Sequence, residues 1–100
     1  KYIENETFNG LYQLKQLHLN NNYLELISQN LFNDLKNLIL LDLSQNRLRF
    51  IEDLSFKNLN HLKEIHIENN LDLILFNYTL YGLSSLKKIK LSYQMLSNNT

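Results

Sequence analysis

Hydrophobic positions recur along this chain with a fixed 24-residue period. One set of recurring positions comprises Leu14, Leu17, Leu19, Asn22, Leu24, Ile27, Phe32 and Leu35. Adding 24 to each number gives Leu38, Leu41, Leu43, Asn46, Leu48, Ile51, Phe56 and Leu59. A second addition gives Leu62, Ile65, Ile67, Asn70, Asp72, Leu75, Leu80 and Leu83. So many matches at one offset indicate a repeated structural unit.

A short alternation of apolar and polar residues predicts one strand in each unit. In Leu17-His18-Leu19 both leucines would point inward and the histidine outward, because side chains alternate across a strand. The same alternation occupies residues 41–43, 65–67 and 89–91. Stacked units would pair these strands in parallel, about 4.8 Å apart. We therefore predict a narrow sheet on the concave side of an arc and mostly irregular return segments on its convex side.

Two positions of the repeat depart from the hydrophobic pattern: a recurring asparagine, and an aspartate that replaces a leucine in one unit. Asn22, Asn46 and Asn70 follow the predicted strands. We expect their amides to bond backbone groups of adjacent units, since unpaired polar groups inside a protein are costly. Asp72 stands where a leucine is expected, and a carboxylate would not be buried there without a partner. We expect the backbone to shift by one residue, so that a neighbouring leucine fills the core.

The pattern L-x-x-L-x-L-x-x-N-x-L is that of a leucine-rich repeat, which predicts an α/β fold class with a leucine-rich repeat solenoid. The whole chain resembles the typical 24-residue class, found mainly in extracellular animal proteins. We interpret residues 1–100 as an internal fragment of one such domain. Its coils would be residues 1–13 (partial), 14–37, 38–61, 62–85 and 86–100 (partial).

A narrower resemblance covers the stretch from Leu62 to Leu96. This stretch is similar to the last coils of a relaxin-type peptide-hormone receptor ectodomain. That resemblance would imply a membrane receptor whose helices lie outside this chain. The chain has no cysteine. Extracellular leucine-rich repeat proteins keep their disulfides in the terminal caps, so cysteine-free central coils are compatible with an ectodomain.

Composition bears on the partners of the protein. Ten acidic residues balance ten basic ones, and without a basic field we expect no nucleic-acid partner. No stretch approaches the roughly 20 apolar residues that span a bilayer, so membrane attachment would come from segments outside this chain. The oligomeric state stays open.

Three N-x-S/T triplets support an exported protein. Those beginning at Asn5 and Asn77 lie three whole repeats apart, so both asparagines occupy the same slot of a return segment. A third triplet begins at Asn98. We expect these three asparagines to be glycosylation sites and the protein to be extracellular or at the cell surface.

The residues offer no catalytic constellation. The chain has neither a Cys nucleophile nor an H-E-x-x-H motif, and its serines lack a positioned base. His18 and His66 occupy the same outward slot two repeats apart, about 10 Å from each other and too far to share a metal ion directly. We therefore expect neither an enzyme nor a bound metal or cofactor.

The outward strand slots form a mixed polar surface with an acidic centre, a basic end and an exposed leucine. Rigid concave surfaces of this kind are where leucine-rich repeats usually bind proteins. We expect a protein or peptide ligand to contact Leu40, Asp42, Glu64, His66, Glu68, Lys88 and Lys90. The predicted function is a non-catalytic recognition module in the ectodomain of a cell-surface receptor. The alternatives are a secreted matrix or adhesion protein and an intracellular leucine-rich repeat scaffold.

Overall fold

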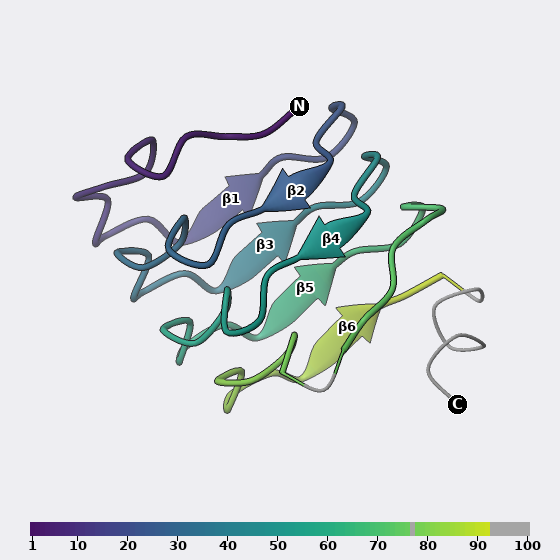
Figure 1. Ribbon diagram of the computed structural model, residues 1–100. Helices are drawn as coiled ribbons and strands as arrows, with labels where there is room; N and C mark the ends of the chain where they lie inside the picture. Colours follow the sequence, from purple (N-terminus) through teal and green to yellow (C-terminus); the bar gives the residue numbers. More distant parts are fainter. Residues whose placement is uncertain (77, 93–100) are drawn as a thin grey trace.

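Parallel pairing of strands one repeat apart organises the computed structural model, which describes residues 1–76 and 78–92 (Figure 1). One sheet has the strand order β1 (Gln16–His18), β3 (Leu40–Asp42), β5 (Glu64–His66) and β6 (Lys88–Lys90). Leu17 pairs with Leu41, Leu41 with Ile65, and Ile65 with Ile89, so each step across the sheet is one repeat of the sequence. The predicted leucine-rich repeat solenoid with a parallel sheet is confirmed.

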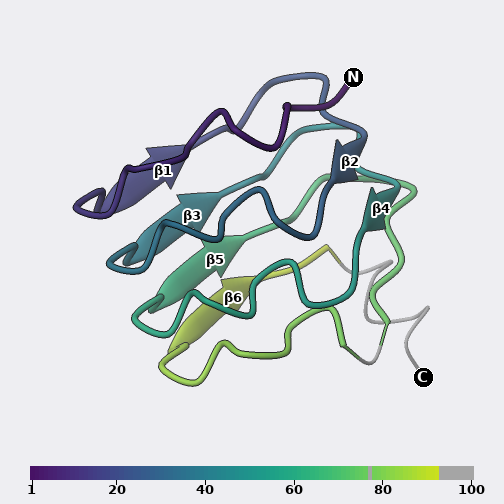
Figure 2. The same cartoon turned by 60° about the vertical axis from the view of Figure 1, so that its left-hand side comes forward.

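A second, smaller sheet lies on the other side of the coils. Its strands β2 (Leu26–Ile27) and β4 (Phe50–Ile51) pair in parallel, and Tyr2 extends it by a bridge to Leu26 (Figure 2). We did not predict these strands, because two residues are too few to show the alternation that identifies a strand. The other return segments consist mainly of turns, and residues 1–76 and 78–92 contain no helix.

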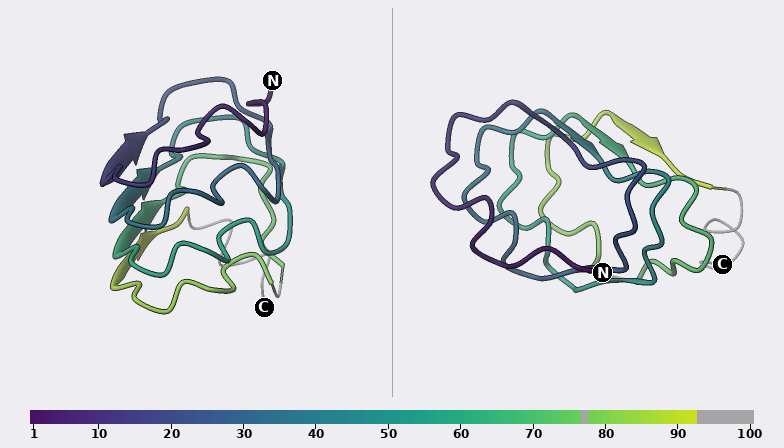
Figure 3. Two further views of the ribbon diagram at one scale, coloured as in Figure 1. Left: turned by 90° about the vertical axis from the view of Figure 1, so that its left-hand side faces the viewer. Right: turned by 90° about the horizontal axis from the view of Figure 1, so that it is seen from above.

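Successive coils stack on one another (Figure 3), and their inward side chains pack together as one core. The inward residues of the two central strands, Leu41 and Ile65, are fully buried. In the return segments, Phe32 lies between Phe8 and Phe56, with ring centroids 6.2 and 6.1 Å apart. These separations lie within the range of favourable aromatic contacts. Equivalent positions of neighbouring coils therefore form the core, and burial is deepest in the middle of the stack.

The predicted asparagine ladder is present at Asn46 and Asn70, each of which ties its coil to the one before it, whereas the amide of Asn22 donates within its own coil. The side-chain oxygen of Asn46 accepts from the N–H of Leu24 at 3.1 Å, and that of Asn70 from the N–H of Leu48 at 2.9 Å. The amide nitrogens donate to carbonyls of two adjacent coils, which are Leu19, Leu43 and Ser44 for Asn46 and Leu43, Ile67 and Glu68 for Asn70. Both asparagines are buried, so these bonds satisfy groups that water does not reach.

A shift of one residue accommodates the irregular slot at Asp72, as predicted. Leu73 is 1% exposed and takes the core position that Leu48 has in the preceding coil, while Asp72 stays in solvent. The regular phase returns at Leu75, which is again buried. The shift leaves Leu71, just before Asp72, 71% exposed. This coil therefore presents an apolar side chain and a carboxylate side by side.

The two glycines of the chain adopt left-handed backbone conformations in the return segments. Their φ angles are +82° at Gly10 and +96° at Gly82. A Cβ atom added to Gly82 would lie 2.6 Å from Cα of Lys57 in the preceding coil, whereas one added to Gly10 would meet nothing within 4 Å. Gly82 therefore serves the close approach of two coils as well as a local turn.

Candidate functional site

The outward side chains of β1, β3, β5 and β6 form two rows across the coils, and together with Glu68 they define the concave face. One row contains Gln16, Leu40, Glu64 and Lys88, and the other contains His18, Asp42, His66 and Lys90. Six of the seven residues expected to contact a ligand therefore lie on adjacent strands. The seventh, Glu68, follows β5 by two residues. Because paired strands lie about 4.8 Å apart, neighbours within a row are in reach of one another.

His66 is the centre of a charged network on the concave face. Its Nε2 contacts Oε2 of Glu64 on the same strand, and its Nδ1 lies 3.8 Å from Oδ2 of Asp42 on β3. Asp42 Oδ1 also accepts hydrogen bonds from the backbone N–H of Ser44 at 3.0 Å and from its hydroxyl at 2.6 Å. The side chains of His66 and Asp42 are 14% and 15% exposed. Their bonding and burial hold the two side chains in fixed positions.

Glu64 lies between the histidine and the basic end of the concave face. The hydrogen bond with His66 is the main cause that lowers the pKa of Glu64 below its ordinary value of 4.5, and the charge of Lys88 acts in the same direction. Partial desolvation opposes both effects. Lys88 Nζ lies 3.9 Å from Glu64 Oε2, and both Lys88 and Lys90 are exposed on β6. Glu64 is therefore ionised at neutral pH and lies beside the basic end of the concave face.

Glu68 and Leu40 complete the concave face. Oε1 of Glu68 is buried and has no hydrogen-bond partner among the residues that the structure describes. A buried carboxylate oxygen without a donor is costly, so a donor supplied by a ligand would be stabilised there. Leu40 is half-buried between the polar side chains of the first row. It offers a small apolar contact next to the acidic centre.

The two strand histidines lie apart, as the sequence predicted. His18 on β1 and His66 on β5 are separated by β3, and His18 contacts Gln16 at 3.2 Å. Among residues 1–76 and 78–92, no group of three or more His, Cys, Asp or Glu side chains could hold a metal ion. In the same part of the chain, no helix has the length and apolar character needed to cross a bilayer.

Of the three expected glycosylation sites, the structure describes one. Asn5 lies in the first return segment, and both Asn5 and Thr7, the third residue of its triplet, are exposed. The hydroxyl of Thr7 donates to the carbonyl of Glu4 at 2.7 Å. Asn77 and Asn98 lie outside the described residues. An enzyme acting on the surface of the solenoid would therefore find the Asn5 side chain accessible.

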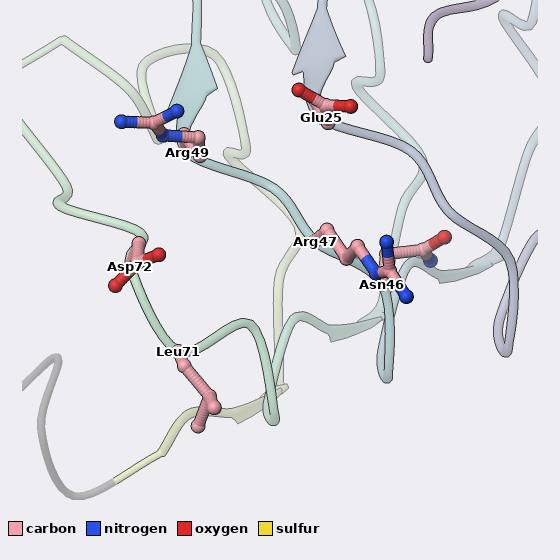
Figure 4. A pocket seen from close by; sticks show the side chains of 6 residues that line it. All are labelled: Glu25, Asn46, Arg47, Arg49, Leu71 and Asp72. Carbon is pink, nitrogen blue, oxygen red and sulfur yellow. The ribbon is translucent and has the colours of Figure 1, made fainter.

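A pocket of about 340 Å³ opens on the flank of the solenoid, where the chain passes from β3 to β4 (Figure 4). Side chains from three successive coils line this flank pocket: Glu25, Asn46, Arg47, Arg49, Leu71 and Asp72. Arg47 and Arg49 are the two arginines of the chain. We did not predict this site. Two signals could have indicated it, namely the clustering of both arginines within three residues and the irregular slot at Asp72.

The comparisons with known proteins agree on the repeat. The family model described as BspA type leucine rich repeat region, in six copies, matches residues 1–99. A solved structure described as the crystal structure of a TLR13–ssRNA13 complex is similar to this chain, with a TM-score of 0.84 and 34% sequence identity. The similarity covers 90% of this chain and 13% of that chain. No curated protein matches significantly.

These matches correct the expectations on class and partner. They support a leucine-rich repeat but give neither the typical 24-residue class nor a relaxin-type receptor. The exclusion of nucleic acid was wrong, because the similar TLR13 structure is a complex with single-stranded RNA. The physical reason is that net charge describes the whole chain, whereas binding depends on local fields. Here Lys88 and Lys90 form a basic end on the concave face, although ten acids balance ten bases over the whole chain.

Proposed function

Because this chain belongs to the family of BspA-type leucine rich repeat regions, we propose that it binds a protein or peptide ligand through its concave face. The chain is a non-catalytic repeat module, as the family and the TLR13 match indicate. The observation that carries the proposal is the network around His66, which fixes Glu64 and Asp42 on adjacent strands beside Lys88. Preformed surfaces lose little conformational entropy on binding.

The chemistry of the concave face specifies the kind of ligand. The carboxylates of Asp42, Glu64 and Glu68 favour an arginine or lysine, since charge-assisted hydrogen bonds are short and directional. The unpartnered Oε1 of Glu68 adds an acceptor that such a donor would satisfy. Lys88 and Lys90 favour an acidic group on the ligand, next to the arginine or lysine that the carboxylates bind. The proposed ligand therefore carries adjacent charges of opposite sign, with an aliphatic part against Leu40.

We also propose a setting for the module, in the ectodomain of a cell-surface receptor. The exposed sequon at Asn5, with those at Asn77 and Asn98, supports an extracellular or cell-surface protein. This chain spans 13% of the TLR13 chain that it resembles, so the proposal concerns the module and its immediate surroundings. Flanking cysteine-rich caps with a membrane helix would support a receptor. Caps alone would support a secreted matrix or adhesion protein, and neither would support an intracellular scaffold.

Binding of single-stranded RNA is a second candidate function, favoured by the description of the TLR13 complex. On this chain the exposed Lys88 and Lys90 would contact phosphates, since cationic side chains supply most of the affinity for nucleic acid. The adjacent carboxylates of Asp42 and Glu64 would repel the same phosphates. This repulsion is why we favour a protein or peptide ligand.

Charge reversal on one face at a time tests the proposal. The concave variant carries Asp42→Lys, Glu64→Lys and Glu68→Lys. The matched control carries Glu4→Lys, Glu6→Lys and Asp53→Lys, at exposed acids of the return segments. Both variants change the net charge equally and differ in where the charge lies. Binding is measured to a display library of peptides that contain lysine or arginine and, in parallel, to a short oligouridylate.

We expect the concave variant to lose peptide binding, at a cost of about 2–5 kcal/mol where a buried charge pair is broken. The control variant should bind as the unmodified protein does, after circular dichroism has shown that both variants are folded. Loss of binding in the control alone would place recognition on the return segments. Binding of the oligouridylate without any peptide, abolished by Lys88→Glu and Lys90→Glu, would favour the second candidate.

A further inference from the structure

The flank pocket lies outside the concave face, and its two arginines line it together with the carboxylates of Glu25 and Asp72. Neither guanidinium lies within 4.0 Å of a carboxylate oxygen among residues 1–76 and 78–92. Arg47 and Arg49 alternate with the buried Leu48, so both side chains lie at the surface, where they point away from each other (Figure 4). Their backbone N–H groups donate to the carbonyls of Leu24 and Glu25 at 2.9 and 3.0 Å. These bonds hold the arginine segment against the preceding coil.

The irregular coil forms the facing wall of the flank pocket. By the 24-residue period, Leu71 corresponds to Arg47 and Leu73 to Arg49. Because Leu73 fills the core in place of Asp72, both Leu71 and Asp72 are left at the surface of the pocket. Because Leu71 is 71% exposed, a ligand that covered it would remove apolar surface from water, which favours binding. The departure from the repeat therefore places an apolar side chain and a carboxylate on the coil next to the arginine segment (Figure 4).

Two side chains of the pocket, Arg47 and Asn46, are restrained before a ligand binds. The guanidinium carbon of Arg47 lies 4.5 Å from the centre of the Tyr23 ring, a cation–π contact that restricts the arginine. Asn46, which also lines the pocket, is buried and engaged in the asparagine ladder. A volume of about 340 Å³ is within the range of ligand-binding pockets. Restricted side chains in a pocket of this size lower the entropic cost of binding.

We propose that the flank pocket is a second binding site, which takes an acidic side chain of an extended peptide. Its carboxylate lies against Arg47 and Arg49, and a neighbouring aliphatic side chain of the peptide covers Leu71. Guanidinium groups suit this role, because their planar array of N–H donors matches the two oxygens of a carboxylate. The site is distinct from the concave face and stands whether or not that face binds a ligand.

The acids that line the pocket favour a peptide over a nucleic acid. Glu25 and Asp72 lie on either side of the arginines and repel a polyanion, whose binding requires several phosphates to be neutralised together. A single carboxylate meets the two guanidiniums without bringing further negative charge. The mixed lining therefore matches a peptide segment with one acidic and one aliphatic residue.

The arginine side chains themselves report on binding. Because Arg47 and Arg49 are the two arginines of the chain, its arginine Nε–Hε resonances come from the flank pocket. The end-blocked peptide Gly-Gly-Leu-Glu-Gly is titrated into the ¹⁵N-labelled chain, with Gly-Gly-Leu-Gln-Gly as the matched probe. We expect saturable shifts of both resonances with the acidic peptide and none with the glutamine peptide. Equal shifts with the two peptides, or no shift with either, would overturn the proposal.

Substitutions locate the interaction. In Arg49→Gln the Arg47 resonance still reports the Kd, which should rise about fivefold, as expected for the loss of one surface charge pair. Lys15→Gln removes an equal charge from an exposed position away from the pocket and should leave the Kd unchanged. Asp72→Asn should lower the Kd, because it removes a negative charge that repels the carboxylate of the peptide. Partial unfolding would raise the Kd instead. Equal effects of Arg49→Gln and Lys15→Gln, or tighter binding of a short oligouridylate than of the acidic peptide, would refute the assignment.

Discussion

The backbone N–H of Leu48 donates a hydrogen bond of 2.9 Å to the side-chain oxygen of Asn70, which lies 22 residues further along the chain. Asn70 is 1% exposed, so water cannot replace it as the acceptor. Asn70→Ala should lower the free energy of unfolding by about 1–3 kcal/mol, the cost of leaving buried polar groups unpaired. Urea denaturation followed by circular dichroism measures this loss.

Asn22→Ala is the matched control for the ladder. Asn22 is exposed, and its amide donates to the carbonyls of Leu19 and Asn20 within its own coil. Water can replace these bonds, so the expected loss is below about 1 kcal/mol. If the two substitutions destabilised the protein equally, the ladder would not link the coils in the way described.

Gly82→Ala should destabilise the protein more than Gly10→Ala. Both substitutions place a side chain at a positive φ and share a strain of about 1–2 kcal/mol. At Gly82 the added Cβ also lies 2.6 Å from Cα of Lys57, which costs a further 1–3 kcal/mol, roughly the penalty for overpacking. Thermal melts of the two variants in parallel measure the difference. A larger loss at Gly10 would contradict the close approach of the two coils.

Phe32→Ala should lower the free energy of unfolding by about 3–5 kcal/mol, the usual cost of truncating a buried phenylalanine. Phe32 is 1% exposed and stacks against both Phe8 and Phe56. Phe8 has one such neighbour and is partly exposed, so Phe8→Ala should cost less. Denaturant midpoints of the two variants provide the comparison. Equal losses would show that the phenylalanine column contributes no more at its centre than at its end.

Glu64→Gln should change how stability depends on pH. The hydrogen bond with His66 and the charge of Lys88 lower the folded-state pKa of Glu64 below its ordinary value of 4.5. The stability gained from ionised Glu64 is therefore fully present above a pH of 4.5 and is lost as the pH falls through the lowered pKa. Urea denaturation of both proteins from neutral pH down to about pH 3 should show their difference shrinking. A difference that stays constant or grows toward acid pH would exclude this linkage.

Glycosylation at Asn5 tests the proposed extracellular setting. Asn5 is exposed, so protein from a secretory host should carry a glycan there, and Asn5→Gln should remove it. Intact-mass analysis before and after glycosidase treatment gives the answer. If the unmodified protein carried no glycan, Asn5 would no longer support an extracellular location.

The register of the fold could be predicted because buried leucines leave a periodic record in the sequence. Leu17, Leu41 and Ile65 are inward residues of paired strands, and their spacing alone aligns β1, β3 and β5. The alternation of inward and outward residues also placed Asp42 and His66 on the concave face. Their contact with each other depends on side-chain conformations, which spacing does not determine.

The flank pocket could not be predicted in this way. Exposed positions such as Arg47 and Arg49 are free of the packing constraint that makes the leucines periodic. Their approach to Leu71 depends on which leucine enters the core near Asp72. The sequence predicted that a shift would occur there, but it left Leu71 and Leu73 as equal choices. The small β2–β4 sheet escaped prediction because each of its strands has two residues, too few to show an alternation.

Every bond that the side chains of Asn46 and Asn70 make joins groups of their own coil or of the coil before it. If residues 38–61 were removed, Asn70 would meet the backbone of Leu19 and Leu24 in place of Leu43 and Leu48. These groups are chemically the same, one carbonyl and one N–H at the same spacing. A gene could therefore lengthen or shorten this molecule in steps of one whole repeat, and each new step would bring fresh outward side chains without any redesign of the interior.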